Sequence, residues 1–143
     1  TIMQLQNNSF GGSIASEIGL ATALRELYIQ NNSIGQSIPP TIGLATSLTD
    51  FNASTNNLRA FFPTEMGLLT NLETLDLEFN QLQGTLPADI GNMTSLEYLW
   101  LTNNPMTGPI PGEQLVSLNL TSLRINGPDL QGLFQLSYVQ LKI

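Results

Sequence analysis

The stretch from Leu72 to Leu82 reads L-E-T-L-D-L-E-F-N-Q-L, and it decides the fold. Apolar residues two positions apart within it, such as Leu75 and Leu77, indicate a short strand with one buried face. Its first leucine recurs with a period of 24 residues, at Leu24, Leu48, Leu72, Leu96 and Leu120. An asparagine recurs with the same period, at Asn8, Asn32, Asn56, Asn80 and Asn104. Repetition this regular predicts a solenoid, because one unit cannot bury its apolar face alone.

The second half of the period is also repeated. Gln83-Gly84-Thr85-Leu86-Pro87 and Thr107-Gly108-Pro109-Ile110-Pro111 are extended segments, because proline excludes helix and restricts the residue before it. Each such segment leads to an apolar residue followed by glycine, as in Ile18-Gly19, Ile42-Gly43, Met66-Gly67 and Ile90-Gly91. Together these motifs resemble the plant-type leucine-rich repeat over essentially the whole chain. The resemblance implies an α/β repeat solenoid, a right-handed superhelix with a concave parallel β-sheet and short convex 3₁₀ turns and β segments.

The domain organisation follows from the same period. We expect one leucine-rich repeat array over residues 1–143, with about six 24-residue repeats, the first and last incomplete. In the third repeat Ala53 occupies an inward position, and we expect Phe51 and Phe62 to fill the space. The pattern becomes irregular after about residue 112, where Gln114-Leu115 replaces the apolar-glycine pair. A shortened repeat is expected near Leu136–Leu141, and the chain is expected to be an excerpt of a longer protein.

Composition excludes several classes of function. The chain has no cysteine and no histidine, which removes thiol nucleophiles, imidazole bases, disulfides and Cys/His zinc sites. We therefore expect no cofactor, no metal and no enzymatic activity. The formal net charge of −7 would repel phosphate backbones, so no nucleic acid partner is expected. No apolar run is long enough to insert into a membrane.

The outward positions of the strands contain the candidate binding residues. Trp100 is the only tryptophan, and the repeat places it between Asp76 and Arg124 on adjacent strands. Tyr98 shares its face, and aromatic residues edged by both signs of charge are typical of a binding hot spot. The alternative is a purely structural contact in which Arg124 stacks on Trp100. The predicted ligand-binding residues of the concave face are Tyr28, Asp76, Glu78, Phe79, Tyr98, Trp100 and Arg124; the asparagine column is expected to be structural.

Two pairs of acids could suggest other chemistry. Asp76 and Glu78 face the same way on one strand, which is compatible with a glycosidase pair. We instead expect solvated acids, because no cleft would raise the pKa of either. Glu26 and Asp50 are neighbours across strands and could share a calcium ion, but ordinary surface acids are the simpler interpretation.

The family resemblance implies a function. We expect a ligand- or protein-binding recognition module from the extracellular domain of a receptor-like protein or receptor-like kinase, located outside the cell or at its surface. Its partner would be a protein or peptide on the concave face. The alternatives are a secreted inhibitor resembling polygalacturonase-inhibiting proteins, whose acidic face binds a cationic enzyme, and a structural or adhesive array. Glycosylation sequons occur at Asn7, Asn31, Asn52, Asn92 and Asn119, of which Asn92 on the convex turn is the favoured acceptor.

Overall fold

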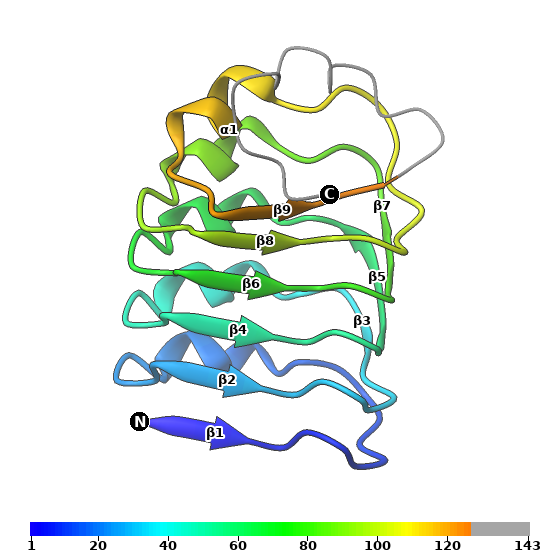
Figure 1. Ribbon diagram of the computed structural model, residues 1–143. Helices are drawn as coiled ribbons and strands as arrows, with labels where there is room; N and C mark the ends of the chain where they lie inside the picture. Colours follow the sequence, from blue (N-terminus) through cyan, green and yellow to red (C-terminus); the bar gives the residue numbers. More distant parts are fainter. Residues whose placement is uncertain (127–143) are drawn as a thin grey trace.

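A six-stranded parallel sheet forms one side of the molecule (Figure 1). The computed structural model describes residues 1–126. Each strand pairs with the strand of the next repeat, and equivalent residues of the two repeats lie side by side, for example Leu75 and Leu99. The strands, in their order across the sheet, are β1 (Ile2–Gln4), β2 (Glu26–Tyr28), β4 (Asp50–Asn52), β6 (Thr74–Asp76), β8 (Tyr98–Trp100) and β9 (Ser122–Arg124). The shortened repeat expected near Leu136–Leu141 lies outside the described residues.

Short 3₁₀ helices stack on the side opposite the sheet (Figure 1). A second, three-stranded parallel sheet connects the two sides. The helices are η1 (Ser16–Leu20), η2 (Pro40–Leu44), η3 (Thr64–Leu68) and η4 (Ala88–Asn92). The strands of the second sheet are β3 (Gly35–Gln36), β5 (Asn57–Phe61) and β7 (Gln81–Gln83). Each repeat is therefore one turn of a coil. In the second, third and fourth repeats an extended segment that ends in proline leads from the second sheet to a 3₁₀ helix, as the sequence predicts.

The core is the space enclosed by these coils. Leu27, Phe51, Leu75 and Leu99 form one inward column, and each is at most 1% exposed. In the third repeat Phe51, Ala53 and Phe62 are all buried, so bulky neighbours do accompany the small Ala53 side chain. Burying this continuous apolar column against the turns of the neighbouring repeats is what stabilises the stack.

The glycine after each buried apolar residue of a 3₁₀ helix is required by close packing. A Cβ atom on Gly43 would lie 2.3 Å from the carbonyl oxygen of Glu65 in the next turn. On Gly67 it would lie 2.6 Å from the carbonyl oxygen of Asp89. Any side chain here would separate consecutive turns.

The fifth repeat departs from this pattern. Its turn is an α-helix, α1 (Gly112–Ser117), in place of a 3₁₀ helix. Leu115 is fully buried, although it occupies the position that glycine takes in the earlier repeats, and Gln114 lies against Gly91. The wider turn of the α-helix accounts for this shift of one residue. Between residues 112 and 126 the irregular sequence corresponds to a change of helix type, and β9 regains the register of the sheet.

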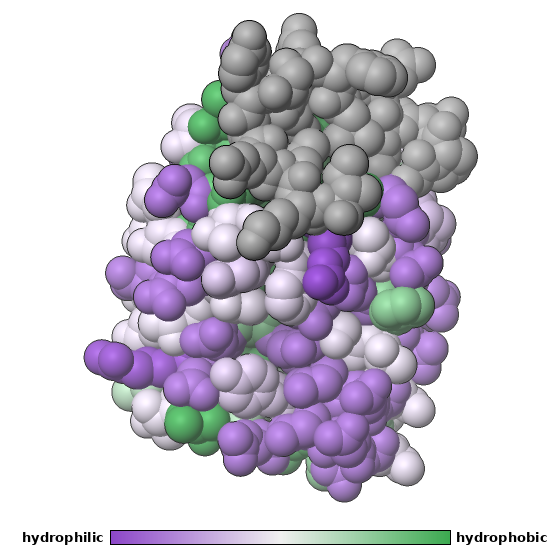
Figure 2. Space-filling model, viewed as in Figure 1, coloured by the Kyte–Doolittle hydropathy of each residue, from purple (hydrophilic) through white to green (hydrophobic). Residues whose placement is uncertain are grey.

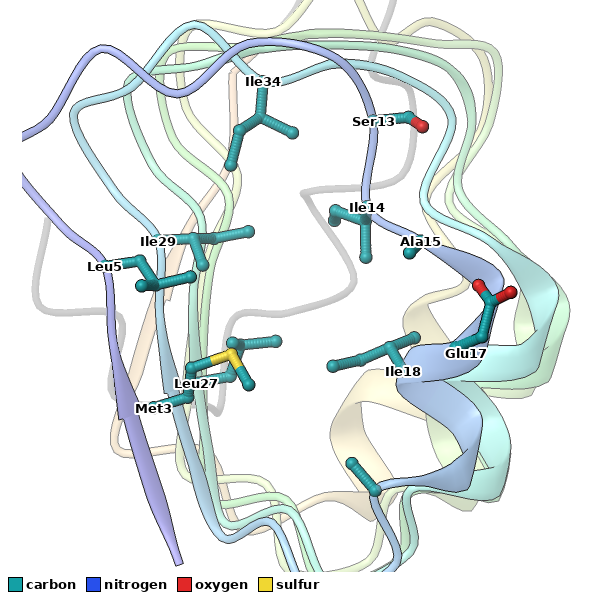
Figure 3. A pocket seen from close by; sticks show the side chains of 11 residues that line it. Met3, Leu5, Ser13, Ile14, Ala15, Glu17, Ile18, Leu27, Ile29 and Ile34 are labelled. Carbon is teal, nitrogen blue, oxygen red and sulfur yellow. The ribbon is translucent and has the colours of Figure 1, made fainter.

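The first repeat has an open apolar end. Met3 and Leu5 are each 37% exposed, whereas Leu27, in the column of Met3, is 1% exposed. Together with Ile14 and Ile18 they surround a hollow of about 360 Å³ between the first strand and the first 3₁₀ helix (Figure 3). These side chains belong to the inward columns that are buried in the later repeats, so the hollow is the uncovered end of the hydrophobic core.

Candidate binding site on the six-stranded sheet

The outer face of the six-stranded sheet carries the predicted aromatic residues. Leu99 points inward and is buried, so the alternation of a strand directs Tyr98 and Trp100 outward. Their rings meet edge to face, with centroids 5.9 Å apart and an interplanar angle of 69°. Both side chains are half-buried. The visible part of the sheet side is mostly hydrophilic to neutral (Figure 2).

Neighbouring strands fix the orientation of the Trp100 ring. Its indole N–H donates to the Ser122 hydroxyl at 3.0 Å. The guanidinium of Arg124 lies over the ring, 4.5 Å from the centroid. Such a cation–π contact contributes about 0.5–1 kcal/mol at an exposed site. Because one face of Trp100 is occupied by a cation and its N–H has a partner, the ring is held in one position.

Arg124 is in turn linked to Glu78. Arg124 Nη1 lies 3.6 Å from Glu78 Oε2, and the Thr102 hydroxyl donates to Glu78 Oε1. The Glu78 side chain is 14% exposed and that of Arg124 is 52% exposed. Solvent screening limits such a pair to about 0–1 kcal/mol, so its main effect is to position Arg124 over Trp100. Sequence analysis missed Ser122 and Thr102, whose only signal was their place on strands next to predicted residues.

The burial of Asp76 contradicts the expectation that both acids of the Asp76–Glu78 pair are solvated. Asp76 is only 7% exposed, so it is not a solvated acid. Asn52 and Trp100 are its partners on the two neighbouring strands. Burial raises the pKa of the Asp76 carboxyl, while a hydrogen bond from the Glu78 backbone N–H at 3.1 Å opposes that rise. Asp76 is therefore a largely covered part of the floor of the site.

Phe79 is exposed and conformationally strained. Its φ is +54°, in the left-handed region that side chains other than asparagine rarely adopt. The equivalent positions in four other repeats have the same conformation, and three of them are asparagine: Asn7, Asn31, Thr55 and Asn103. The Phe79 side chain is nevertheless 56% exposed, so burial does not account for the choice of phenylalanine.

Tyr28 lies apart from the other predicted residues. It is on β2, three strand spacings from β8, or about 14 Å. Burial raises the pKa of its phenol, and a hydrogen bond with Glu26 and the negative charges of Asp50 and Glu26 act in the same direction. The structure thus brings Glu78, Tyr98, Trp100 and Arg124 together over Asp76, and leaves Tyr28 in a separate acidic part of the sheet.

The candidate calcium pair has no further ligand. Glu26 and Asp50 are direct partners in the register of β2 and β4. Within residues 1–126, however, no group of three or more acidic side chains could hold a metal ion. A pair of carboxylates alone supplies few of the six to eight oxygens that calcium takes.

The asparagine column contacts the backbone at the end of each strand. Asn80 Oδ1 accepts from the Leu58 N–H at 2.9 Å, and its Nδ2 donates to the carbonyl groups of Ala53 and Leu77 at 2.9 and 3.2 Å. Asn56 and Asn104 repeat this arrangement, and all three are at most 7% exposed. Asn32 is half-buried and makes the corresponding bonds, whereas Asn8 is exposed and donates only to Leu5 and Gln6.

Comparison with known families agrees with the fold. Leucine Rich repeats (2 copies) matches residues 70–135, and Leucine Rich Repeat matches residues 23–44. The two matches together cover more than half of the chain. This protein belongs to the leucine-rich repeat family. The predicted plant-type leucine-rich repeat solenoid is confirmed. Among curated proteins, no sequence matches it significantly.

This leucine-rich repeat chain is similar to solved plant structures. The ectodomain of the membrane receptor kinase GASSHO1/SCHENGEN3 from Arabidopsis thaliana, in complex with CASPARIAN STRIP INTEGRITY FACTOR 2, is 37% identical with a TM-score of 0.82. That match covers 84% of this chain and 14% of the receptor chain. The plant peptide hormone receptor RGFR1, in complex with RGF2, is 36% identical, with a TM-score of 0.79 and coverages of 83% and 19%. This chain therefore spans less than a fifth of either receptor chain.

A third similar structure has another role. A plant ice-binding protein is 27% identical with a TM-score of 0.81, and the match covers 88% of this chain and 41% of that one. Within the described residues, no helix is long and apolar enough to cross a membrane.

Proposed function

We propose that this chain is a recognition module that binds a protein or peptide ligand on the outer, concave face of its six-stranded sheet. The observation that carries the proposal is the fixed Trp100 ring, packed against Tyr98 and Arg124. We place the centre of the site at these three residues, with Phe79 and Glu78 at its edge. Tyr28 belongs to a second, acidic part of the same face.

The aromatic site has the properties of a binding hot spot. Tryptophan, tyrosine and arginine are the residues that most often dominate binding energy. Immobilising a side chain on binding costs about 0.5–1.5 kcal/mol, and Trp100 is already held by Ser122 and Arg124. The strained, exposed Phe79 supports the same site, because strained conformations cluster at functional positions.

The similar receptors support an extracellular location for this module. Two of them are receptors determined with bound ligands, so we propose that this chain is part of the extracellular domain of a receptor-like protein or receptor-like kinase. It would then lie outside the cell or at its surface. We also take it to be non-catalytic, because Asp76 accepts from the Glu78 backbone N–H and the Glu78 carboxylate is held by Thr102 and Arg124.

The acidic part of the sheet supports one alternative. Glu26 and Asp50 lie side by side next to Tyr28, and a cationic enzyme bound there would make the protein an inhibitor. The ice-binding relative shows that the solenoid itself does not decide the ligand. The two candidates place the contact on different strands, which an experiment can distinguish.

Selection from a random peptide library displayed on phage tests the proposal. Peptides that bind the wild-type chain are selected from the library. Their affinities for wild type are then compared with those for Trp100→Ala, Glu26→Gln and Phe61→Ala. Phe61 is a matched control, because it is an exposed aromatic residue on the second sheet. We expect Trp100→Ala to weaken binding at least about tenfold, or about 1.4 kcal/mol, and Phe61→Ala to have no effect. Equal binding to wild type and Trp100→Ala would contradict the proposal, and loss only with Glu26→Gln would favour the inhibitor.

A further inference from the structure

A row of exposed leucines crosses the helix side of the solenoid, away from the proposed binding site. Leu20, Leu44 and Leu68 end the first three 3₁₀ helices and are 78%, 55% and 54% exposed. They occupy the same position in consecutive turns that pack in direct contact, so they form one continuous apolar surface, here called the leucine ridge. An isolated exposed leucine is ordinary, but a contiguous apolar surface marks an interaction site.

The fold does not require leucine at this position. The fourth turn has Asn92 in the equivalent place, and its 3₁₀ helix has the same length and stacks in the same way. The leucines therefore expose apolar area for which the protein's own packing offers no reason. Sequence analysis missed the ridge, although its 24-residue spacing was visible.

Acids accompany the ridge on one side, except beside Leu44, where Thr41 takes their position. Glu17, Glu65 and Asp89 each lie three residues before the ridge position of their own 3₁₀ helix. Side chains three residues apart eclipse in a 3₁₀ helix, so each acid lies beside the ridge position. The residues two positions after the ridge position are uncharged and exposed: Thr22, Thr46, Thr70 and Thr94.

These acids disfavour a second copy of this chain as the occupant. Two ridges packed against each other would bring both sets of acids, on chains of net charge −7, into one interface. An anionic membrane surface is disfavoured for the same reason. A partner with apolar side chains and basic residues along one flank is complementary to both features.

The spacing of the ridge favours a helical partner. Neighbouring turns are about one strand spacing apart, or about 4.8 Å, so the three leucines span about 10 Å. A helix that presents one apolar side chain per turn covers about 11 Å over two turns of about 5.4 Å. An extended strand places side chains of one face about 6.7 Å apart and would cover about 13 Å. The span of the helix therefore matches the span of the three leucines within about 1 Å, whereas the span of the strand does not.

We propose that the leucine ridge is a second interaction surface, which binds an amphipathic helix of a partner protein with its axis along the stack of repeats. The helix has apolar residues at about i, i+4 and i+7 and lysine or arginine along the flank that faces Glu17, Glu65 and Asp89. This surface is independent of the ligand site around Trp100.

The test uses a synthetic four-turn amphipathic peptide with one leucine per turn and lysines along one flank. Its affinity for the full chain is measured by titration calorimetry, beside two control peptides, one with glutamate in place of lysine and one with a central proline. The triple variant Leu20→Asn, Leu44→Asn, Leu68→Asn is matched to the natural Asn92 and is expected to keep its circular dichroism spectrum. We expect this variant to bind the lysine peptide at least about tenfold more weakly than wild type, and wild type to bind neither control peptide.

A charge control distinguishes attraction of the peptide to the acids beside the ridge from attraction to the net negative charge of the chain. Glu17→Gln with Glu65→Gln is compared with Glu73→Gln and Glu97→Gln, which make the same charge change outside the ridge. Only the first pair is expected to weaken binding, by about threefold or more. Equal affinity of wild type and the leucine variant overturns the proposal, as does equal weakening by the two glutamine pairs. A leucine-dependent dimer in sedimentation, or leucine-dependent binding to phosphatidylcholine vesicles, would also overturn it in favour of those occupants.

Discussion

The guanidinium of Arg124 lies 4.5 Å from the centre of the Trp100 ring, one strand away, while it also contacts Glu78. Arg124 thus connects the charged and aromatic parts of the site. Because Trp100 is the only tryptophan, its fluorescence reports this contact without interference.

Replacing Arg124 should release the Trp100 ring. We expect Arg124→Ala to change the tryptophan emission of the folded protein and to lower the free energy of unfolding by about 0.5–1 kcal/mol. Fluorescence spectra and urea unfolding check both effects. Arg59→Ala is the control, since Arg59 lies on the second sheet. An unchanged spectrum in Arg124→Ala would show that the contact does not persist in solution.

The buried asparagines should be essential for stability. Asn80→Ala leaves the Leu58 N–H without its partner, whereas the Ala53 and Leu77 carbonyl groups each keep a second donor, from Asn56 and Asn104. A buried polar group left unpaired costs about 1–3 kcal/mol, so we expect a loss of about 1–3 kcal/mol in urea unfolding. Asn8→Ala, at the exposed end of the column, should cost less than about 1 kcal/mol. Similar losses for the two variants would contradict a burial-dependent role.

The left-handed positions offer stabilising substitutions. Thr55 has a φ of +54° where Asn31 and Asn103, at equivalent positions, have 55° and 58°. Asparagine tolerates this conformation better than a β-branched residue. We expect Thr55→Asn to raise the free energy of unfolding by about 1 kcal/mol. A lower midpoint of unfolding for Thr55→Asn would show that threonine makes a compensating contact.

Phe79 should show a conflict between stability and binding. Phe79→Asn relieves the same strain and is expected to stabilise the fold by about 1 kcal/mol. It also removes an exposed ring from the edge of the proposed site, so selected peptides should bind it more weakly. Parallel measurement of unfolding and peptide affinity tests both parts. If Phe79→Asn is more stable and binds equally well, Phe79 is not part of the site.

The repeat period allowed the sequence to predict the backbone. It placed the strands, the asparagine column and the outward position of Trp100, because all of these depend on one structural unit repeated in register. The burial of Asp76 depends on which side chains the neighbouring strands place beside it, Asn52 and Trp100, and periodicity does not encode it. The same holds for the hydrogen bonds that fix the site, because they depend on side-chain rotamers across neighbouring strands.

Asp76 should make stability depend on pH. Its pKa is raised in the folded state, so the folded protein retains this proton to a higher pH than the unfolded chain. Stability contributed by protonated Asp76 is therefore lost as pH rises from the ordinary aspartate pKa, about 3.9, through the raised folded value. Asp76→Asn should remove this dependence and raise stability at neutral pH. Urea unfolding between pH 4 and 7 checks it, and a wild-type curve identical in shape to that of Asp76→Asn would contradict the assignment.

Glycosylation tests the proposed extracellular location. Asn92 ends η4, is exposed and lies on the helix side, away from the proposed site. Asn52 is less suited, because its side-chain oxygen accepts from the Ser54 N–H and hydroxyl. In a eukaryotic secretory host we expect Asn92 to be the main glycosylated residue, as read by mass spectrometry of peptides. Modification of Asn52 with an unoccupied Asn92 would contradict this.

Hydrogen–deuterium exchange with a library-selected peptide shows whether ligand binds around Trp100. We expect the peptide to slow exchange in segments 76–80, 98–103 and 122–126 of the wild-type chain, with no slowing in Trp100→Ala at the same peptide concentration. Slowing confined to the 3₁₀ helices, to β2 and β4, or to the open end of the first repeat would contradict it.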